Sequence, residues 1–329
     1  MSLYGLSFDM RNPDQAGTTM AERYAAAIDM AEWADRLGFV VIVLSEHHGS
    51  DDGYLPSPLT MAAAMAARTE HVRIQIAALI APFHDPLRLA EDIAVVDLVS
   101  NGRLDLVIAN GYVPGEFEMF GHELSERVKL TVETVETLKQ AWTGEPFEFR
   151  GRTVRVLPTP AQPGGPRISH GGSGPKAAKR AARIADGFMP SDGSIWETYR
   201  DEMLALGKPD PGPFLGGDTS AFHLARDPEQ GWKGYAPFAM HEVNAYGAWM
   251  ASAGIGAEGG YQTVEDPDAL RATGQYRVLT PDELAAEIQA KGEFGFTIFH
   301  PMAGGVPPAM AWESLQLFEH EVLPQLTDG

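Results

Sequence analysis

Titratable residues directly follow a run of aliphatic residues at positions 40–44. The run reads Val-Val-Ile-Val-Leu and is followed by Ser45, Glu46, His47 and His48. Five consecutive aliphatic residues are typical of a strand buried on both faces, as in a parallel sheet covered by helices. A carboxylate and an imidazole at such a strand end can exchange protons near neutral pH. Successive strand side chains point to opposite faces, so we interpret His47 as functional and His48 as structural.

Further polar residues follow other predicted strands at the same relative position. A single histidine is more often structural than functional, but five of the ten histidines fall at these strand ends. In a barrel of alternating strands and helices, the strand ends that lead into helices form the active site. We therefore predict that these segments meet at one mouth: Glu46-His47-His48, Pro82-Phe83-His84, Asn110-Gly111-Tyr112, His170-Gly171-Gly172-Ser173, Pro190-Ser191-Asp192 and His300-Pro301.

A glycine-rich segment at residues 171–176, Gly-Gly-Ser-Gly-Pro-Lys, follows a predicted strand and opens a predicted helix. Free backbone N–H groups at such a helix start bind phosphate, which predicts a phosphate site that Lys176 can assist. An ordinary helix cap is the equally weighted alternative. The segment also matches a dinucleotide fingerprint, but its mid-chain position and the lack of a following acidic residue disfavour that interpretation. The other basic residues of this helix are typical of a solvated face.

Metal binding is a weaker interpretation of the histidines. Zinc hydrolases built on a barrel use histidines two positions apart on an early strand, whereas His47 and His48 are adjacent. Asp51 and Asp52 offer oxygen ligands for a hard cation, but Asp-Asp-Gly is also an ordinary turn. The sequence therefore predicts no metal site.

The elements that position these residues alternate between strand and helix along the chain. A capping box at Thr19 and Glu22 starts the first helix, and about eight strand–helix units follow. That number closes a (β/α)8 TIM barrel. We predict one domain over residues 1–329, with a hairpin insertion near 146–156 and irregular or lid segments near 207–280.

Composition limits the function classes further. The 329 residues carry a formal net charge of −20 and include no cysteine. This acidity argues against nucleic-acid partners and against anionic membrane surfaces. The absence of cysteine excludes disulfides and thiolate chemistry. No apolar run approaches the length of a membrane span, and no signal peptide is evident, so we expect a cytoplasmic protein.

Three blocks of the sequence resemble the bacterial luciferase-like flavin-dependent monooxygenases. They are Ser-Glu-His-His-Gly at 45–49, the stretch 76–92 that contains Ala-Pro-Phe-His-Asp-Pro, and Val-Ser-Asn-Gly-Arg at 99–103. The resemblance extends over residues 3–142 and returns at 171–187, and the Trp-Glu-Ser-Leu helix at 312–315 also fits. It implies a TIM barrel, reduced FMN, molecular oxygen, a small organic substrate, a separate flavin reductase and a homodimer.

The resemblance also implies roles for individual residues. His47 corresponds to the histidine that supports the reaction of flavin with oxygen, beside Glu46. Ala77 and Ala78 correspond to a frequent non-prolyl cis peptide under the flavin ring. Asn110 lies where relatives contact the cofactor, although luciferase has an arginine there. This difference shifts phosphate binding toward Gly171, Gly172, Ser173, Gly174 and Lys176.

Two alternatives to an FMN-dependent monooxygenase stay open within the same fold. One is an F420-dependent oxidoreductase that moves hydride without oxygen, for which the basic helix face would suit an acidic cofactor tail. The Glu-His-His sequence instead favours FMN. The other is a member of the fold that binds flavin without catalysis.

Overall fold

The computed structural model describes residues 2–214, 216, 220–256 and 260–327. The chain divides into two compact units. The first unit comprises residues 1–43, 47–56 and 217–329, and the second comprises residues 44–46 and 57–216. Each unit is built from parallel strands and helices, as the alternating sequence pattern predicted.

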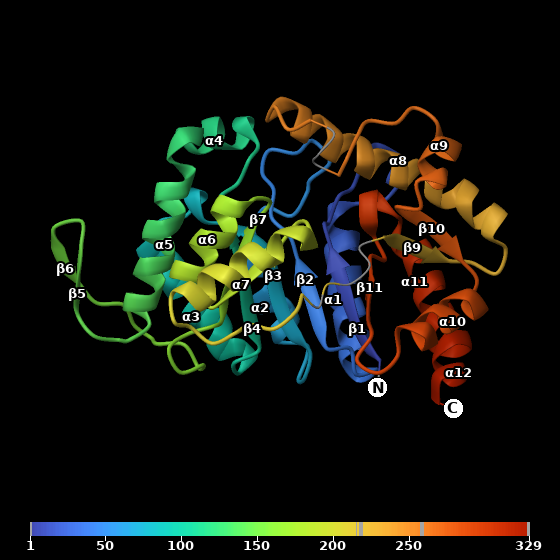
Figure 1. Ribbon diagram of the computed structural model, residues 1–329. Coiled ribbons are helices and arrows are strands. Elements are labelled where there is room, and N and C mark those ends of the chain that lie inside the picture. The colour runs from blue at the N-terminus through green and yellow to red at the C-terminus, as the bar shows by residue number, and fades with distance from the viewer. Residues whose placement is uncertain (1, 215, 217–219, 257–259, 328–329) are drawn as a thin grey trace. The chain divides into compact units, whose positions relative to one another are not determined.

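The first unit is organised around the parallel pair β1 and β11, which lie side by side in Figure 1. Strands β9 and β10 pair in parallel with each other and form a separate two-stranded sheet. The described elements of this unit are β1 (Leu3–Phe8), α1 (Met20–Arg36), the start of β2 (Val41–Leu44), β9 (Ala221–Leu224), α8 (Pro228–Ser252), α9 (Pro267–Ala272), β10 (Tyr276–Leu279), α10 (Pro281–Lys291), β11 (Phe296–Phe299), α11 (Pro308–Leu317) and α12 (Leu323–Thr327).

Helix α1 begins where the capping box predicted. The Thr19 side chain accepts a hydrogen bond from the backbone N–H of Glu22, and the Glu22 carboxylate accepts one from the Thr19 N–H. Farther along the helix, the fully buried Arg23 donates to the carbonyl oxygens of Met302 and Gly305. These bonds fix α1 to the turn that follows β11.

The second unit contains the parallel strands β3, β4, β7 and β8, hydrogen-bonded in that order. An antiparallel hairpin of β5 and β6 turns at Arg150 and Gly151, where the sequence predicted a hairpin. The elements are α2 (Pro58–Ala66), β3 (Arg73–Ile80), α3 (Pro86–Ser100), β4 (Leu104–Ala109), α4 (Pro114–Phe120), α5 (Arg127–Ala141), β5 (Phe147–Phe149), β6 (Arg152–Val154), β7 (Ile168–Gly172), α6 (Pro175–Ile184), β8 (Gly187–Pro190) and α7 (Trp196–Ala205).

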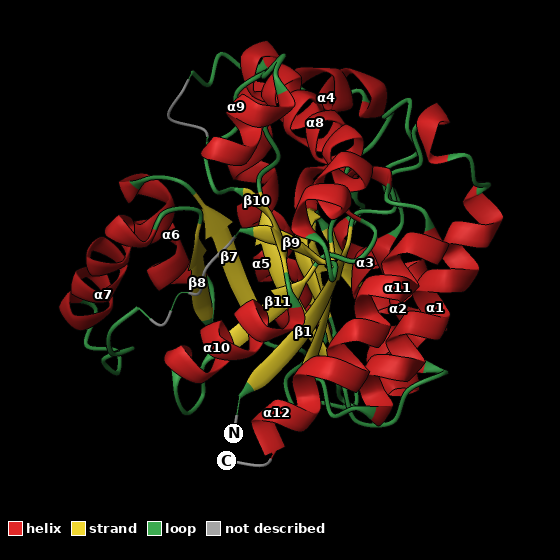
Figure 2. Ribbon diagram, turned by 90° about the vertical axis from the view of Figure 1, so that its right-hand side faces the viewer, coloured by secondary structure: helices red, strands yellow, loops and turns green. Residues whose placement is uncertain are grey.

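Small residues let α6 pack closely in the second unit. Ala177, Ala178, Ala181 and Ala182 form one buried stripe of α6, which packs in a core cluster with Phe188 of β8 and Tyr199 of α7. Figure 2 shows α6 and α7 side by side next to β8. The glycine-rich start of α6 is therefore carried by a closely packed helix.

Several elements differ from the sequence prediction. Helices α4, α7 and α9 and strand β10 were not predicted, and helix α5 is preceded by a 3-10 turn at Leu124–Glu126. Strands β9 and β10 pair only with each other among the described residues, so the closed eight-stranded barrel stays a prediction.

The predicted irregular segments are partly described. Residues 208–214 and 260–265 contain neither helix nor strand. Residues 215, 217–219 and 257–259, which the same prediction covers, lie outside the described residues.

Candidate functional site

The carboxylate of Glu46 is held by the end of β3. Its Oε2 atom accepts a hydrogen bond from the backbone N–H of Ile80 at 2.7 Å, and its Oε1 atom lies 3.0 Å from Nε2 of His84. The Glu46 side chain is fully buried, whereas that of His84 is 27% exposed. Because both oxygens are engaged, this geometry favours a positioning role, and a catalytic role for Glu46 stays a prediction.

Two other features predicted for cofactor binding lie at the ends of neighbouring strands in this unit. The peptide bond between Ala77 and Ala78 of β3 is cis, as the resemblance predicted. Asn110 follows β4, and its Oδ1 atom is enclosed without a hydrogen-bond partner among the described residues. An enclosed amide oxygen without a partner is costly, which marks Asn110 as a group that a ligand would complete.

The glycine-rich segment between β7 and α6 leaves its amides open. The backbone N–H groups of Ser173, Gly174 and Lys176 donate no hydrogen bond within the described part of the chain. Ser173 and Lys176 are exposed to solvent. A Cβ atom on Gly172 would lie 2.4 Å from Cβ of Ala177, so only glycine fits this close approach of strand and helix. This geometry fits an anion at the start of α6.

Two arginines near this segment were not predicted to take part in the site. Arg180 of α6 donates from Nε to Nε2 of His170 at 3.0 Å, and Nδ1–H of His170 donates to the carbonyl of Gly171. Burial and the charge of Arg180 lower the pKa of His170 to about 4, so the imidazole is neutral at pH 7. His170 thereby fixes Arg180 beside the glycine segment.

Arg127 supplies a second positive charge in the same unit. Burial and then the charge of Arg127 lower the pKa of Arg180, which places the two guanidinium groups within electrostatic reach of each other. Neither arginine forms an ion pair with a carboxylate among the described residues, although Arg183 of the same helix pairs with Glu202. In a chain of net charge −20, two adjacent arginines without carboxylate partners indicate an anion site.

His47 lies in the first unit, within a group of aromatic rings. Its imidazole is buried and stacks on the indole of Trp249, with ring centroids 4.2 Å apart and an interplanar angle of 26°. Tyr54 and Tyr246 contact the imidazole edge-on at 4.9 Å and 6.0 Å. The backbone N–H of His47 donates to the carbonyl of Leu55. The ring is thus held by neighbours that come from the 47–56 segment and from α8.

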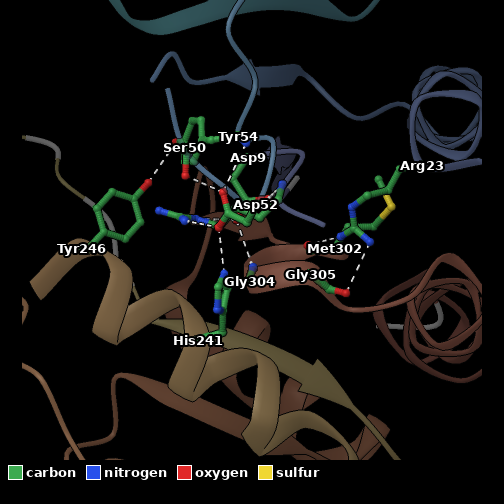
Figure 3. A network of polar contacts seen from close by, with 11 residues as sticks. Asp9, Arg23, Ser50, Asp52, Tyr54, His241, Tyr246, Met302, Gly304 and Gly305 are labelled. Carbon is green, nitrogen blue, oxygen red and sulfur yellow. Dashed lines mark hydrogen bonds and ion pairs between the residues drawn. The ribbon is translucent and has the colours of Figure 1, made fainter. Parts of the chain in front are cut away.

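A charged network lies beside this aromatic group, and Figure 3 shows most of its members. The fully buried Arg11 forms an ion pair with Asp52, which also accepts a hydrogen bond from Ser50 and lies 2.7 Å from Nε2 of His241. Burial opposes ionisation of Asp52, but the hydrogen bond with His241 and the charge of Arg11 lower its pKa. Asp52 is therefore an ionised anchor within this network rather than only a turn residue.

A second acidic group of the first unit, Glu242, differs from Asp52 because its pKa is raised. Oε2 of Glu242 on α8 is enclosed without a hydrogen-bond partner among the described residues. The same holds for the hydroxyl of Tyr235, which lies earlier in the same helix. Burial and the negative charge of Asp9 raise the pKa of Glu242 to about 8. Burial lowers the pKa of His300, which follows β11, to about 4. Both groups are therefore uncharged near pH 7.

Local sequence patterns explain which of these residues were found. Glu46, Ala77, Ala78, Asn110 and residues 171–176 all belong to the second unit, whereas His47 belongs to the first. Arg11 lies after the first strand and Asp52 lies in a turn. Two of the three rings that contact Arg11, those of Tyr246 and Trp249, come from α8, which lies far along the chain. The signal that points to Arg11 is an arginine directly after the first strand, in the segment Asp-Met-Arg-Asn-Pro.

The chain belongs to the luciferase-like monooxygenase family, whose sequence profile matches residues 5–297. The structure of the monooxygenase RslO1 from Streptomyces bottropensis is similar, with a TM-score of 0.77 and 28% sequence identity over 98% of this chain and 99% of that chain. The fold is therefore the luciferase-like α/β fold with a parallel, curled sheet.

The curated relatives divide between two cofactors. The FMNH2-dependent dimethylsulfone monooxygenase of Pseudomonas putida is 26% identical over 291 residues, which cover 81% of this chain and 79% of that protein. The oxygenase component of the flavin-dependent trigonelline monooxygenase of Acinetobacter baylyi is 32% identical over 150 residues, 44% of this chain and 41% of that protein. The F420-dependent glucose-6-phosphate dehydrogenase of Amycolatopsis mediterranei is 29% identical over 189 residues, 54% of this chain and 56% of that protein.

The named relatives are flavin-dependent monooxygenases and F420-dependent dehydrogenases, all of them oxidoreductases. The chain spans about two fifths of the length of the first curated relatives that it matches. No helix in the described ranges is long and apolar enough to cross a membrane.

Proposed function

We propose that this protein is the oxygenase of a two-component system that uses FMN reduced by a separate reductase. In the overall reaction, one atom of O2 enters a small organic substrate, the other leaves as water, and FMNH2 is oxidised to FMN. Two features support this proposal, namely the relative named as FMNH2-dependent over 79% of its length and the relative named as an oxygenase component. We propose further that both units belong to one luciferase-like domain, since the family profile spans them.

The observation that carries the proposal is the anion site of the second unit. Open amides at Ser173, Gly174 and Lys176, together with the charge of Arg180 on the same helix and of Arg127 near Arg180, match the charge and donor needs of a phosphate group. The enclosed Oδ1 atom of Asn110 matches a ring N–H donor. These residues fit FMN, which is a planar ring system that carries a phosphate.

When bound, the reduced flavin supplies the electrons that activate oxygen. His47 holds or accepts a proton on its imidazole during this chemistry, and Trp249 keeps the ring in a fixed orientation. Glu46 acts on the site through β3, because its carboxylate holds the Ile80 amide and the His84 ring. The apolar side chains around His47 exclude water, which protects reactive intermediates from hydrolysis.

An F420-dependent oxidoreductase is the second candidate. The anion site also suits F420, and relatives named as F420-dependent match about half of the chain. This candidate requires hydride transfer without oxygen, so the two reactions differ in their need for O2.

Cofactor binding and oxygen dependence test the proposal together. FMN and F420 are added separately to the purified chain, and quenching of tryptophan fluorescence is measured. We expect binding of FMN, and oxidation of reduced FMN by O2 that slows in His47→Ala by about 100-fold. Binding of F420 alone, with turnover under nitrogen, would favour the second candidate. Unchanged flavin oxidation in His47→Ala would contradict the role of His47.

A homodimer is the remaining proposal, and an apolar stripe on α3 supports it. Val95, Leu98 and Val99 lie at helical spacing and are 45–49% exposed. Adjacent exposed aliphatic residues are unusual on a monomer and mark interaction surfaces. Sedimentation velocity should give twice the chain mass for the wild type and a shift toward the monomer for Val95→Lys combined with Val99→Lys. Equal sedimentation of both proteins would place any dimer contact elsewhere.

A further inference from the structure

Arg11 joins three separate segments of the first unit. It follows β1, and its side chain pairs with Asp52 of the 47–56 segment. Its guanidinium carbon lies 4.8 Å from the ring centroid of Tyr54, 4.9 Å from that of Tyr246 and 4.6 Å from that of Trp249. The last two rings belong to α8. A single cation therefore contacts the end of β1, the segment that contains His47, and α8.

The hydrogen bonds of this guanidinium are few for so deeply buried a group. Only Nη1 donates to a carboxylate, and Nε and Nη2 donate no hydrogen bond within the described residues. Nε lies 3.8 Å from Asp9, too far for a hydrogen bond. Burial opposes the charge, but Tyr246, Asp9 and Asp52 outweigh it and raise the pKa of Arg11. The rest of the cation is stabilised by aromatic rings, whose faces attract positive charge.

The link from Arg11 to the imidazole runs through Trp249. The same indole that lies 4.6 Å from Arg11 stacks on His47 at 4.2 Å. Tyr54 and Tyr246 join their hydroxyls at 2.8 Å and also contact both Arg11 and His47. His47 thus rests on the same three rings that surround Arg11.

A buried ion pair is weak evidence for stability, because desolvation offsets much of its attraction. The arrangement is better explained by its effect on ring orientation. Without the cation, Trp249 and Tyr246 lose the contact that draws their faces inward, and the buried Asp52 carboxylate keeps its contacts with His241, Ser50 and the Tyr54 amide but loses its ion pair.

We propose that Arg11 is a positioning residue that holds Trp249 against His47 and so fixes the orientation of the imidazole. The effect of Arg11 on the reaction rests on the proposed function, because that function gives His47 its role. The contact by which Arg11 holds Trp249 against His47, called the clamp below, does not depend on that function. Arg11 acts on His47 through Trp249, which contacts both residues. A small misorientation of a proton-transferring group costs one to two orders of magnitude in rate.

The test compares Arg11→Met and Arg11→Lys in the full chain. Arg23→Met is the matched control, because Arg23 is equally buried in the same unit but binds only the carbonyls of Met302 and Gly305. The first readout is the emission of Trp249 in the protein without cofactor, obtained as the difference from Trp249→Phe in each background. We expect Arg11→Met to shift this emission to longer wavelength, Arg11→Lys to restore part of the shift, and Arg23→Met to leave it unchanged.

The second readout is the oxidation of FMNH2 bound to the protein. Arg11→Met should slow it by about 10- to 100-fold, with unchanged affinity for FMN, and Arg11→Lys should recover part of the rate. If Arg11→Met does not fold, Trp249→Leu tests the same link and should slow oxidation to a similar extent. Wild-type emission and oxidation in folded Arg11→Met, or wild-type oxidation in Trp249→Leu, would overturn the clamp. Unchanged oxidation in His47→Ala would contradict the proposed role of His47, and the emission of Trp249 would still decide whether Arg11 holds Trp249 in place.

Discussion

The two units surround their arginines differently. In the first unit, Arg11 and His241 both contact Asp52, and aromatic rings lie against the rest of the Arg11 guanidinium. In the second unit, the backbone N–H groups of Ser173, Gly174 and Lys176 have no partner in the described residues, and there Arg127 and Arg180 bond to a carbonyl and an imidazole in place of a carboxylate. An arginine that already has a carboxylate partner is suited to position other residues, whereas an arginine without one can bind an anion. This difference supports the proposals that Arg11 is a positioning residue and that the second unit binds the cofactor.

The largest expected effect comes from adding a side chain at Gly172 of the glycine-rich segment. Gly172→Ala introduces a Cβ atom that would lie 2.4 Å from Cβ of Ala177, so the strand and helix must separate and the open amides lose their alignment. We expect a loss of FMN affinity of about 100-fold, measured by fluorescence titration.

Gly174→Ala is the matched control for this change. Gly174 has an extended backbone with φ of −158°, and its added Cβ meets no atom within 4 Å. Its affinity should stay within about threefold of wild type. Equal losses in both variants would mean that the segment tolerates no side chain anywhere, and the specific role of the Gly172 approach would be wrong.

A smaller effect is expected from the arginines of the second unit. Arg180→Ala and Arg127→Ala each remove one charge-assisted contact to a phosphate and should weaken FMN binding by about tenfold, with a weaker dependence on salt concentration. Arg183→Ala removes an equal charge from α6, but Arg183 is paired with Glu202, so its effect should be minor. Three equal losses would indicate a general field effect in place of a defined anion site.

The smallest expected effect concerns stability in the first unit. The pKa of Glu242 is raised from 4.5 to about 8, so the unfolded chain ionises this group between those pH values while the folded chain retains the proton. Stability from this group is therefore lost as pH rises from about 4.5 to about 8.

Glu242→Gln replaces the titrating carboxyl group with a neutral amide. The stability of this variant relative to wild type should therefore increase as the pH rises from 5 to 8. We expect a relative rise in Tm of about 3 °C or more, measured by thermal denaturation at both pH values. Glu293→Gln, at an exposed position, is the control and should show no such pH dependence. A Tm difference that does not change with pH would contradict the buried, protonated state of Glu242.

Sequence predicted the parts of the molecule that follow from local patterns. The strand before Glu46, the capping box of α1 and the glycine segment before α6 are each encoded within a few neighbouring residues. The strand is not buried on both faces as predicted, because Val40 is exposed and burial alternates along Val41–Leu44. The family resemblance added the cis bond at Ala77, which local pattern does not specify. Helix α7 and strand β10 were missed because they are short and lie in stretches rich in glycine and proline or in mixed polarity.

The cage around Arg11 was missed for a different reason. Its members come from three distant stretches, and none carries a pattern that distinguishes a cage residue from ordinary packing. Arg127 and Arg180 were also missed, because a basic residue on a helix is most often solvated. What identifies them is that, among the described residues, they bond to a carbonyl and an imidazole and pair with no carboxylate, which only the folded chain reveals.

The chain passes from the second unit to the first between Glu46 and His47. The Glu46 carboxylate is hydrogen-bonded to the Ile80 amide at the end of β3 and to His84. The imidazole of His47, the next residue, stacks on Trp249 of α8. One peptide bond therefore separates a residue held by β3 of the second unit from a residue held by the aromatic rings of the first unit. The two backbone torsions on either side of that bond are the shortest covalent route by which an event in one half reaches the imidazole.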